Sequence, residues 1–207
     1  MRRKSKGLSN LFVALRRILP TVFVRTLPVH AANKMKGLFN MMELKIRDML
    51  ATDWNEVQKI YEQGIETNLA TFETSCPSYA DWNQAHLQKC RYVITDEAGV
   101  VGWAVLSPVS TRCVFSGMAE VSIYIDENFK NRGAGTKLLS HMIQESEKNG
   151  FWLIESLIFQ NNSASLHLHE KCGFRTVGYR EKMGKDKEGA WRNVVVMERR
   201  SALSQFE

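Results

Sequence analysis

The first 42 residues contain no aspartate or glutamate, and nowhere does the 207-residue sequence hold a long uninterrupted apolar run. A helix that crosses a bilayer needs about 20 consecutive apolar residues, and no stretch approaches that length. The apolar run 11–15 is also too short, before Arg16 and Arg17, to form the centre of a secretory signal. These absences argue against a membrane-spanning protein and against a signal-directed one.

Because residues 1–42 contain no acidic residue, the net positive charge of the chain is concentrated there. Residues 1–42 carry 9 of the 28 Lys and Arg and none of the 22 Asp and Glu, so the rest of the chain has an excess of three acids. A mildly acidic body is not typical of a protein that binds nucleic acid. The basic stretch fits an organelle transit peptide, a membrane-surface helix, or an upstream extension of a chain whose translation starts at Met41 or Met42. The abrupt change of composition at this methionine pair favours the last interpretation.

Closely spaced cysteines are absent as well. The four cysteines lie far apart, without a Cys-x-x-Cys pair: Cys76, Cys90, Cys113 and Cys172. This spacing argues against a disulfide framework or a zinc site and predicts reduced thiols in a cytoplasmic protein. His167 and His169 form a His-x-His pair, but no third ligand follows at metal spacing, so we expect no metal.

Two common phosphate-loop motifs are also missing. The chain has no Gly-Lys-Ser/Thr sequence and no GxGxxG followed by an acid about 20 positions later. It has instead a β-branched run, Val121–Ile125, a polar break over 126–131, and a helical pattern that starts at Gly133, Ala134 and Gly135 and runs to about Asn149. Glycines let a ligand approach the backbone, and the unpaired amides at a helix start attract anions. The pattern therefore predicts a phosphate-binding turn, although glycine there can also serve the turn alone.

The remaining pattern alternates strands and helices over residues 43–201. Strands are expected at 43–47, 91–95, 100–106, 152–159, 174–183 and 191–197. Helices are expected from about 51, from 78 to about 89, and from 163. Asp53 and Glu56 are spaced like a capping box, and Asn162 is expected to cap the last helix. Strand–helix–strand units need crossovers, so we expect an α/β fold whose mixed sheet has a parallel centre. Residues 202–207 are expected to form a short C-terminal tail.

The segment from Lys130 to Gly135 resembles the pyrophosphate loop of the GCN5-related N-acetyltransferase (GNAT) superfamily, Arg/Gln-x-x-Gly-x-Gly/Ala, with lysine at the first position. Residues 43–200 resemble its phosphinothricin and methionine sulfoximine branch. The segments that carry this resemblance are 60–61, 70–74, 102–104, Arg112-x-x-Phe115-x4-Glu120, 162–174 and 191–198. The resemblance implies the GNAT fold, with six to seven strands and about four helices in one domain at 43–201. It also implies acetyl-CoA as co-substrate and a homodimer.

The resemblance assigns catalytic roles to named residues. It implies that Glu120 is the base that deprotonates the amine, directly or through a water, whereas a glutamate at a strand end is otherwise most often a solvated carboxylate. His169 occupies the position of a tyrosine that donates a proton to the departing thiolate. A half-buried structural histidine, with the thiolate leaving unprotonated, is an equally good interpretation.

The resemblance also implies which residues hold the two substrates. The coenzyme is expected to contact the splayed strand, the turn and the last helix cap: Ile123, Tyr124, Ile125, Asn131, Arg132, Gly133, Ala134, Gly135, Thr136 and Asn162. The substrate is expected to contact Phe72, Glu73, Arg112, Phe115, Ser122 and Trp191. Arg112 suits a carboxylate or phosphinate, Glu73 an ammonium, and the aromatics a side-chain pocket, although aromatics are more often core.

These assignments predict an N-acetyltransferase that acts on a small amino acid or analogue of the methionine sulfone or phosphinothricin type. A protein N-terminus or a polyamine is the alternative substrate within the same fold. A non-catalytic module that senses coenzyme A, and a basic tail that attaches to a membrane or nucleic acid, are alternatives of other classes.

Overall fold

The computed structural model describes residues 44–203 of the chain. The predicted extension 1–42 lies outside the described residues, as does most of the predicted tail. Within the described part, no helix is both long enough and apolar enough to cross a membrane.

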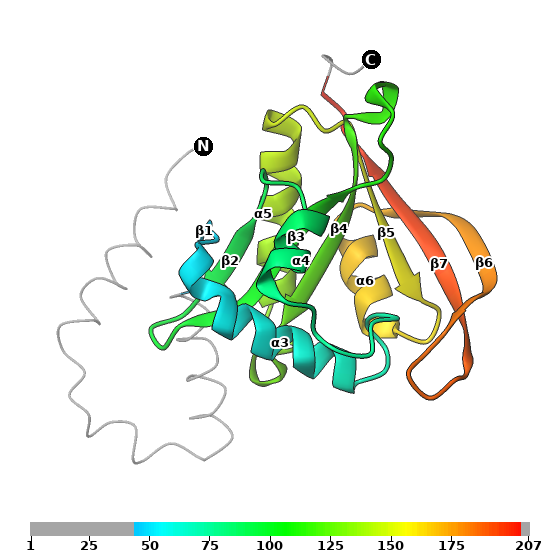
Figure 1. Ribbon diagram of the computed structural model, residues 1–207. Helices are drawn as coiled ribbons and strands as arrows, with labels where there is room; N and C mark the ends of the chain where they lie inside the picture. The colour runs from blue at the N-terminus through cyan, green and yellow to red at the C-terminus, as the bar shows by residue number, and fades with distance from the viewer. Residues whose placement is uncertain (1–43, 204–207) are drawn as a thin grey trace, which may run out of the picture. The chain divides into compact units, whose positions relative to one another are not determined.

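The described residues form a seven-stranded sheet and four α-helices, as Figure 1 shows. The strands are β1 (Lys45–Asp48), β2 (Tyr92–Thr95), β3 (Val100–Pro108), β4 (Met118–Ile125), β5 (Leu153–Phe159), β6 (Arg175–Lys185) and β7 (Trp191–Arg200). The α-helices are α3 (Trp54–Glu66), α4 (Tyr79–Ala85), α5 (Ala134–Lys148) and α6 (Ser163–Lys171), and short 3-10 turns lie at η2 (Ala51–Asp53), η3 (Cys113–Phe115) and η4 (Glu127–Phe129). The predicted mixed α/β class, strand number and helix number are confirmed.

The sheet has the order β1-β2-β3-β4-β5-β7-β6, and β4–β5 is the one parallel pair among the described strands. The parallel strands β4 and β5 are connected through α5, as a parallel pair requires. The predicted parallel centre is therefore confirmed.

The parallel pair is short. β4 and β5 pair only at Met118–Leu153, Ala119–Ile154 and Glu120–Glu155, and then the two strands separate. In Figure 1 their arrows diverge toward their C-terminal ends. β4 stays paired with β3 on its other side as far as Ile125, so the edge of β4 that faces β5 has no strand partner beyond Glu120. This V-shaped opening positions the site.

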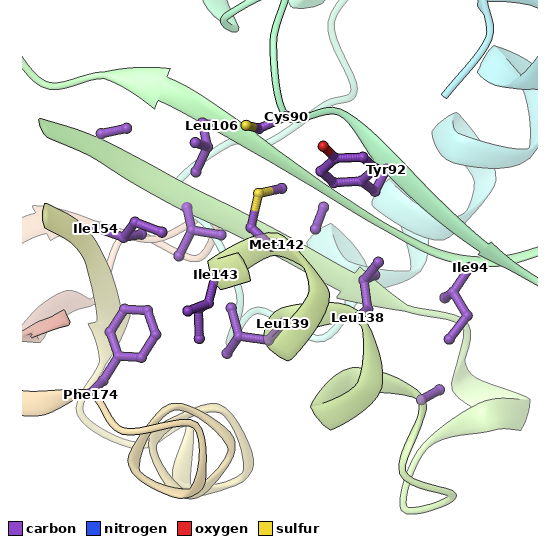
Figure 2. Packing of buried hydrophobic residues seen from close by; sticks show 14 of the residues in the cluster. Cys90, Tyr92, Ile94, Leu106, Leu138, Leu139, Met142, Ile143, Ile154 and Phe174 are labelled. Carbon is purple, nitrogen blue, oxygen red and sulfur yellow. The ribbon is translucent and has the colours of Figure 1, made fainter. Parts of the chain in front are cut away.

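Helix α5 covers one face of the sheet and forms the larger core. Its Leu138, Leu139 and Met142 are fully buried, and the helix supplies these side chains at the spacing of one apolar stripe. Figure 2 shows them among side chains from β2, β3 and β5 and beside Phe174. The start of α5 is thereby held rigidly beside the end of β4.

Helices α3 and α4 cover the other face with an aromatic cluster. Tyr61 of α3 contacts Trp103 edge-on, with 5.5 Å between the ring centroids. Trp103 stacks on Tyr124 of β4, with 4.6 Å between the ring centroids. Trp82 of α4 meets Trp103 at 5.9 Å. Burial of such large rings fixes α3 against the outer half of β4.

Two local expectations are wrong. Asp53 does not form a capping box with Glu56, because its carboxylate accepts hydrogen bonds from both terminal nitrogens of Arg47, at 2.7 and 2.8 Å, and from the Leu50 amide at 2.8 Å. Helix α4 ends at Ala85, well before the predicted end near residue 89. There the His86 imidazole and the Arg91 guanidinium take up the backbone carbonyls that a longer helix would have paired.

Candidate active site

The opening between β4 and β5 forms a cavity of about 280 Å³ that reaches both faces of the sheet. From the face of α3 come Tyr61 and the loop residues 69–73, and from the opposite face come Asn162, Ser165 and His169 of the α6 region. Glu120, Ser122 and Tyr124 project into it from alternate positions of β4. We call it the acyl cavity.

Glu120 lies at the closed end of the V, at the last paired position of β4. Burial raises the pKa of its carboxyl, the nearby Glu155 carboxylate raises the pKa further, and Arg180 acts in the opposite direction. A carboxylate with a raised pKa, open to a cavity, has the properties of a general base. Glu120 therefore lines the acyl cavity, and its role as the base stays a prediction.

His169 is buried, with 1 % of its surface exposed, and lines the same cavity from α6. Its Nδ1 lies 2.8 Å from the carbonyl oxygen of Ser165, and a carbonyl can only accept, so Nδ1 carries the proton. Nε2 is buried without a hydrogen-bond partner among the described residues. Burial lowers the pKa of His169, although the Ser165 carbonyl works against that shift. The neutral ring therefore offers a lone pair rather than a proton at Nε2.

A second cavity, of about 430 Å³, lies at the start of α5. Asn131, Gly133, Gly135 and Thr136 line it, with Lys130 and Lys171 at its wall. Gly133 has a left-handed φ of 80°, and the first bond of the α5 ladder joins Lys137 N to Gly133 O, so the amides just before Lys137 are free for a ligand. A Cβ on Gly135 would lie 3.2 Å from Leu168, which shows how closely backbone and cavity wall approach there. We call it the phosphate cavity.

The two cavities meet at shared residues. Ile123 of β4 and Asn162 and Ser165 of the α6 region line both. Asn162 accepts a hydrogen bond from the Ser165 amide at 3.1 Å, which confirms the predicted helix cap. Its amide nitrogen also donates to the carbonyl of Leu69 at 3.0 Å, which ties α6 to the loop over the acyl cavity. A long ligand with a phosphate at one end and a reactive group at the other fits this path.

Comparison with known protein families shows which family has this fold. A family model described as the Acetyltransferase (GNAT) family matches residues 52–174. The chain belongs to the GNAT acetyltransferase family.

Individual GNAT relatives show which branch of the family the chain resembles. The phosphinothricin N-acetyltransferase of Streptomyces viridochromogenes is 28% identical over 155 residues, which cover 73% of this chain and 84% of that protein. The L-methionine sulfoximine/L-methionine sulfone acetyltransferase of Pseudomonas paraeruginosa is 26% identical over 163 residues, covering 76% and 94%. The crystal structure of a GNAT superfamily phosphinothricin acetyltransferase from Sinorhizobium meliloti in complex with AcCoA has a TM-score of 0.68 and 27% identity, covering 76% and 88%. The chain is thus a GNAT N-acetyltransferase of the phosphinothricin and methionine sulfoximine acetyltransferase-like branch.

Most of the predicted site residues of this GNAT chain come together, but not all. Phe72, Glu73, Ser122, Tyr124, Glu120 and His169 line the acyl cavity; Ile125, Asn131, Gly133, Gly135 and Thr136 line the phosphate cavity; Ile123 and Asn162 line both. Ala134 is buried beneath the turn, and Arg132 stacks over Phe129 at 5.3 Å. Arg112, Phe115 and Trp191 line neither cavity. Arg112 lies instead over the Phe115 ring at 5.2 Å, in the connection before β4.

The loop 67–78, which walls the acyl cavity, is held by the β6–β7 hairpin. Asp186 in the hairpin turn accepts hydrogen bonds from Asn68 at 3.1 Å and from the Arg192 guanidinium at 2.5 Å. Lys187 donates to the carbonyl of Glu66 at 3.0 Å. The ring of Phe72 lies 4.6 Å from that of Phe159 on β5, so the loop closes over the end of the V.

Several residues of the site were not predicted from the sequence. Ser165 lines both cavities and accepts the bond from His169, and Met183 reaches the acyl cavity from a bulge in β6. The i, i+4 spacing of Ser165 and His169 on one helix was a usable signal. Met183 had none, because its position depends on the register shift between Arg180 and Gly184.

Proposed function

We propose that the chain transfers the acetyl group of acetyl-CoA to the α-amine of a small amino acid or amino-acid analogue of the methionine sulfone, methionine sulfoximine or phosphinothricin type. One observation carries the proposal: Glu120 faces a cavity that shares the lining residues Ile123, Asn162 and Ser165 with the cavity at the start of α5. The names of the relatives support this class of substrate.

In this proposal Glu120 is the base, and the start of α5 binds the co-substrate. The free amides before Lys137 and the side chains of Lys130 and Lys171 suit the phosphates of coenzyme A. An α-ammonium has a pKa near 8 and attacks only after it has lost a proton, which Glu120 accepts directly or through a water. The amine nitrogen then bonds to the thioester carbon and loses its second proton to solvent, and the carbon–sulfur bond breaks as the thiolate leaves.

The carbonyl oxygen gains negative charge during this attack. The edge of β4 beyond Glu120 has no strand partner, so an amide among Ile123, Tyr124 and Ile125 is available to donate to that oxygen. The thiolate leaves without a proton from His169, since the neutral imidazole carries its hydrogen on Nδ1. In this scheme Nε2 of His169 accepts a hydrogen bond from substrate or a bound water.

The charge of the acyl cavity favours a second candidate, a cationic amine without a carboxylate, such as a polyamine. Glu73 and Glu120 are its charged lining residues, and no Lys or Arg lines it among residues 44–203. An amino acid needs a cation for its carboxylate. Arg180 is available nearby, because it faces Val194 of the cavity wall in the β6–β7 register.

The test is release of coenzyme A thiol with acetyl-CoA and matched amines. L-methionine sulfone, L-methionine sulfoximine and phosphinothricin are compared with spermidine and with a short peptide. We expect the highest kcat/KM with the amino-acid analogues. Higher turnover with spermidine would move the function to the second candidate. No release with any amine, together with tight coenzyme binding by calorimetry, would leave a coenzyme A sensor.

We also propose that the enzyme works as a homodimer in the cytoplasm and needs no metal, nucleic acid or membrane. Among residues 44–203 no cluster of His, Cys, Asp and Glu has the arrangement of a metal site. Sedimentation of the purified chain tests the dimer, and activity in excess EDTA tests the metal.

A further inference from the structure

Glutamates occupy one row across the centre of the sheet. Glu120 of β4 pairs with Glu155 of β5, and Glu155 pairs with Glu198 of β7. Glu198 in turn pairs with Arg175 of β6. Directly opposed residues share a face and bring their Cβ atoms to about 5 Å of each other. Three carboxylates therefore lie side by side on the face of the sheet to which Ser122 and Tyr124 also point.

The charges in this row are not compensated evenly. Glu198 accepts a hydrogen bond from Arg175 at 2.5 Å and lies 3.7 Å from Arg200. Within residues 44–203, the carboxylates of Glu120 and Glu155 make no hydrogen bond and no ion pair. Like charges directly opposed destabilise a sheet. In the described part of the chain, the carboxylates of Glu120 and Glu155 lack an ion-pair partner at the point where β4 and β5 separate, which calls for a functional explanation.

Glu155 does not line either cavity, whereas Glu120 lines the acyl cavity. An effect of Glu155 on a bound ligand would therefore be indirect. We propose that Glu155 is a positioning residue for acetyl transfer: its carboxylate, held opposite Glu120 at the last paired register of β4 and β5, makes Glu120 a stronger base. The inference rests on the proposed role of Glu120.

The physical reason is mutual repulsion of two carboxylates in a partly buried setting. Burial and the Glu155 charge both raise the pKa of Glu120, and Arg180 opposes them. Burial also raises the pKa of Glu155, where Arg180 opposes and Glu198 adds to the shift. Two such groups titrate as a pair. A base whose pKa approaches that of the substrate ammonium takes its proton with a smaller energy penalty.

Other groups around Glu120 do not supply this effect. Its neighbour on β3 is Ser107, which does not titrate. The titratable groups that share the cavity from the loop, α3, β4 and α6 are Glu73, Tyr61, Tyr124 and His169. The tyrosines and His169 are neutral near pH 7, and Glu73 lies on the loop rather than opposite Glu120. Glu155 is therefore the group to change.

The experiment compares Glu155→Gln with wild type in the full chain, by kcat/KM for L-methionine sulfone from pH 5.5 to 9. Loss of the neighbouring charge lowers the pKa of Glu120, so the acidic limb of the profile moves to lower pH. We expect the midpoint of the acidic limb to lie at a lower pH in Glu155→Gln than in wild type. Glu155→Asp keeps the charge and should bring the limb back toward wild type.

Glu198→Gln is the matched control, since it removes the next carboxylate of the row, which Arg175 already neutralises. It should move the limb much less than Glu155→Gln. An unmoved limb in Glu155→Gln, or equal shifts in the two variants, would overturn the inference.

A second readout does not depend on turnover. Carbon-13 NMR titration of the Glu120 carboxyl, assigned with Glu120→Gln, measures its pKa in wild type and in Glu155→Gln. A lower pKa in the variant supports the inference even if no amine is acetylated, and an unchanged pKa rejects it even if the enzyme is active. Failure of the proposed function and failure of this inference are thus separate results.

Discussion

Glu120 lies at the last paired position of β4 and β5, its carboxyl has a raised pKa, and it lines the acyl cavity. Glu120→Gln keeps the shape of the side chain but cannot accept a proton. We expect kcat to fall by about 10²–10⁴, the usual contribution of a general base. Stopped-flow or steady-state thiol release with saturating L-methionine sulfone measures this loss.

Calorimetric titration with coenzyme A is the control, because the phosphate cavity lies on other residues and its affinity should not change. A Glu120→Gln variant with wild-type kcat would remove the base from the mechanism. Loss of coenzyme binding would instead show that the substitution disturbed the fold.

His169 is a test of the leaving-group step. Because burial lowers its pKa and Nδ1 donates to Ser165, the ring is neutral near pH 7 with a bare Nε2. His169→Phe should therefore lower kcat by less than about tenfold, below the 10²–10⁴ of a general acid, and should leave the alkaline limb of the pH profile in place. Disappearance of that limb in the variant would restore histidine as the proton donor. Nitrogen-15 NMR of the His169 ring determines which of its two nitrogens carries the proton.

Single residues were predictable where their role depends on local spacing. The Asn162 cap follows from its place before a helix. Glu120 was singled out by the family resemblance, and its catalytic role stays a prediction. Glu155 was not predictable in this way, since its partners Glu120 and Glu198 are set by cross-strand register. An acid inside the apolar strand LIESLIF was the only trace of it.

At the scale of elements, the start of α5 is set by its small residues. A side chain at Gly135 would meet Leu168 at 3.2 Å and Ile125 at 3.7 Å, and it would enter the phosphate cavity. Gly135→Val should weaken coenzyme A binding by about tenfold, or about 1.4 kcal/mol. Calorimetry measures the affinity, and the thermal midpoint of the variant separates a blocked site from a damaged helix.

The junction between β1 and α3 depends on Asp53. The Arg47 hydrogen bonds hold the pKa of Asp53 below its usual value, against the opposing effect of burial. The ionised carboxylate therefore stabilises the fold at pH values above the pKa of the unfolded chain, and this contribution is lost as pH falls through the lowered pKa. Asp53→Asn should reduce the free energy of unfolding by about 1 kcal/mol at pH 7, allowing for the exposed Arg47.

Urea unfolding at several pH values measures this effect. The difference between variant and wild type should shrink in acid, as Asp53 of the wild type takes up its proton. A difference that stays constant down to pH 2 would mean that packing, rather than charge, sets the cost.

Elements were predicted well where a periodic pattern and a stop signal agree. The strand before the turn and α5 after it follow from β-branched and helical spacing, with Gly150 at a left-handed φ of 88° as the end. The missing pairing of β4 beyond Glu120 was expected only from the family resemblance, because separation of two strands leaves no mark in either strand's own sequence. Asp53 and Glu56 had the right spacing for a cap, but Arg47 binds Asp53 more strongly.

At the scale of the whole molecule, the alternation of strands and helices predicted the mixed sheet, and the composition change near residue 43 separated the basic stretch from the domain. Contacts between segments that lie far apart in the sequence were not predictable. The β6–β7 hairpin holds the loop 67–78 through Asn68 and Asp186, residues 118 positions apart. Arg112, Phe115 and Trp191 were grouped with the substrate by resemblance, yet they line no cavity within residues 44–203, so their role remains a prediction.

The last prediction concerns the basic residues 1–42. Within the described range 44–203, the residues that line the two cavities lie between Tyr61 and Val194. A chain that starts at Met42 should therefore keep the kcat/KM and thermal midpoint of the full-length protein, while it loses 9 of the 28 basic side chains. Its remaining excess of acids should abolish retention on anionic vesicles, whereas the full chain should be retained at low salt and released as salt screens the charges. Co-sedimentation with anionic vesicles at two salt concentrations, beside the thiol-release assay, measures both effects. A fall in kcat/KM on truncation would show that the basic stretch contributes to the reaction itself.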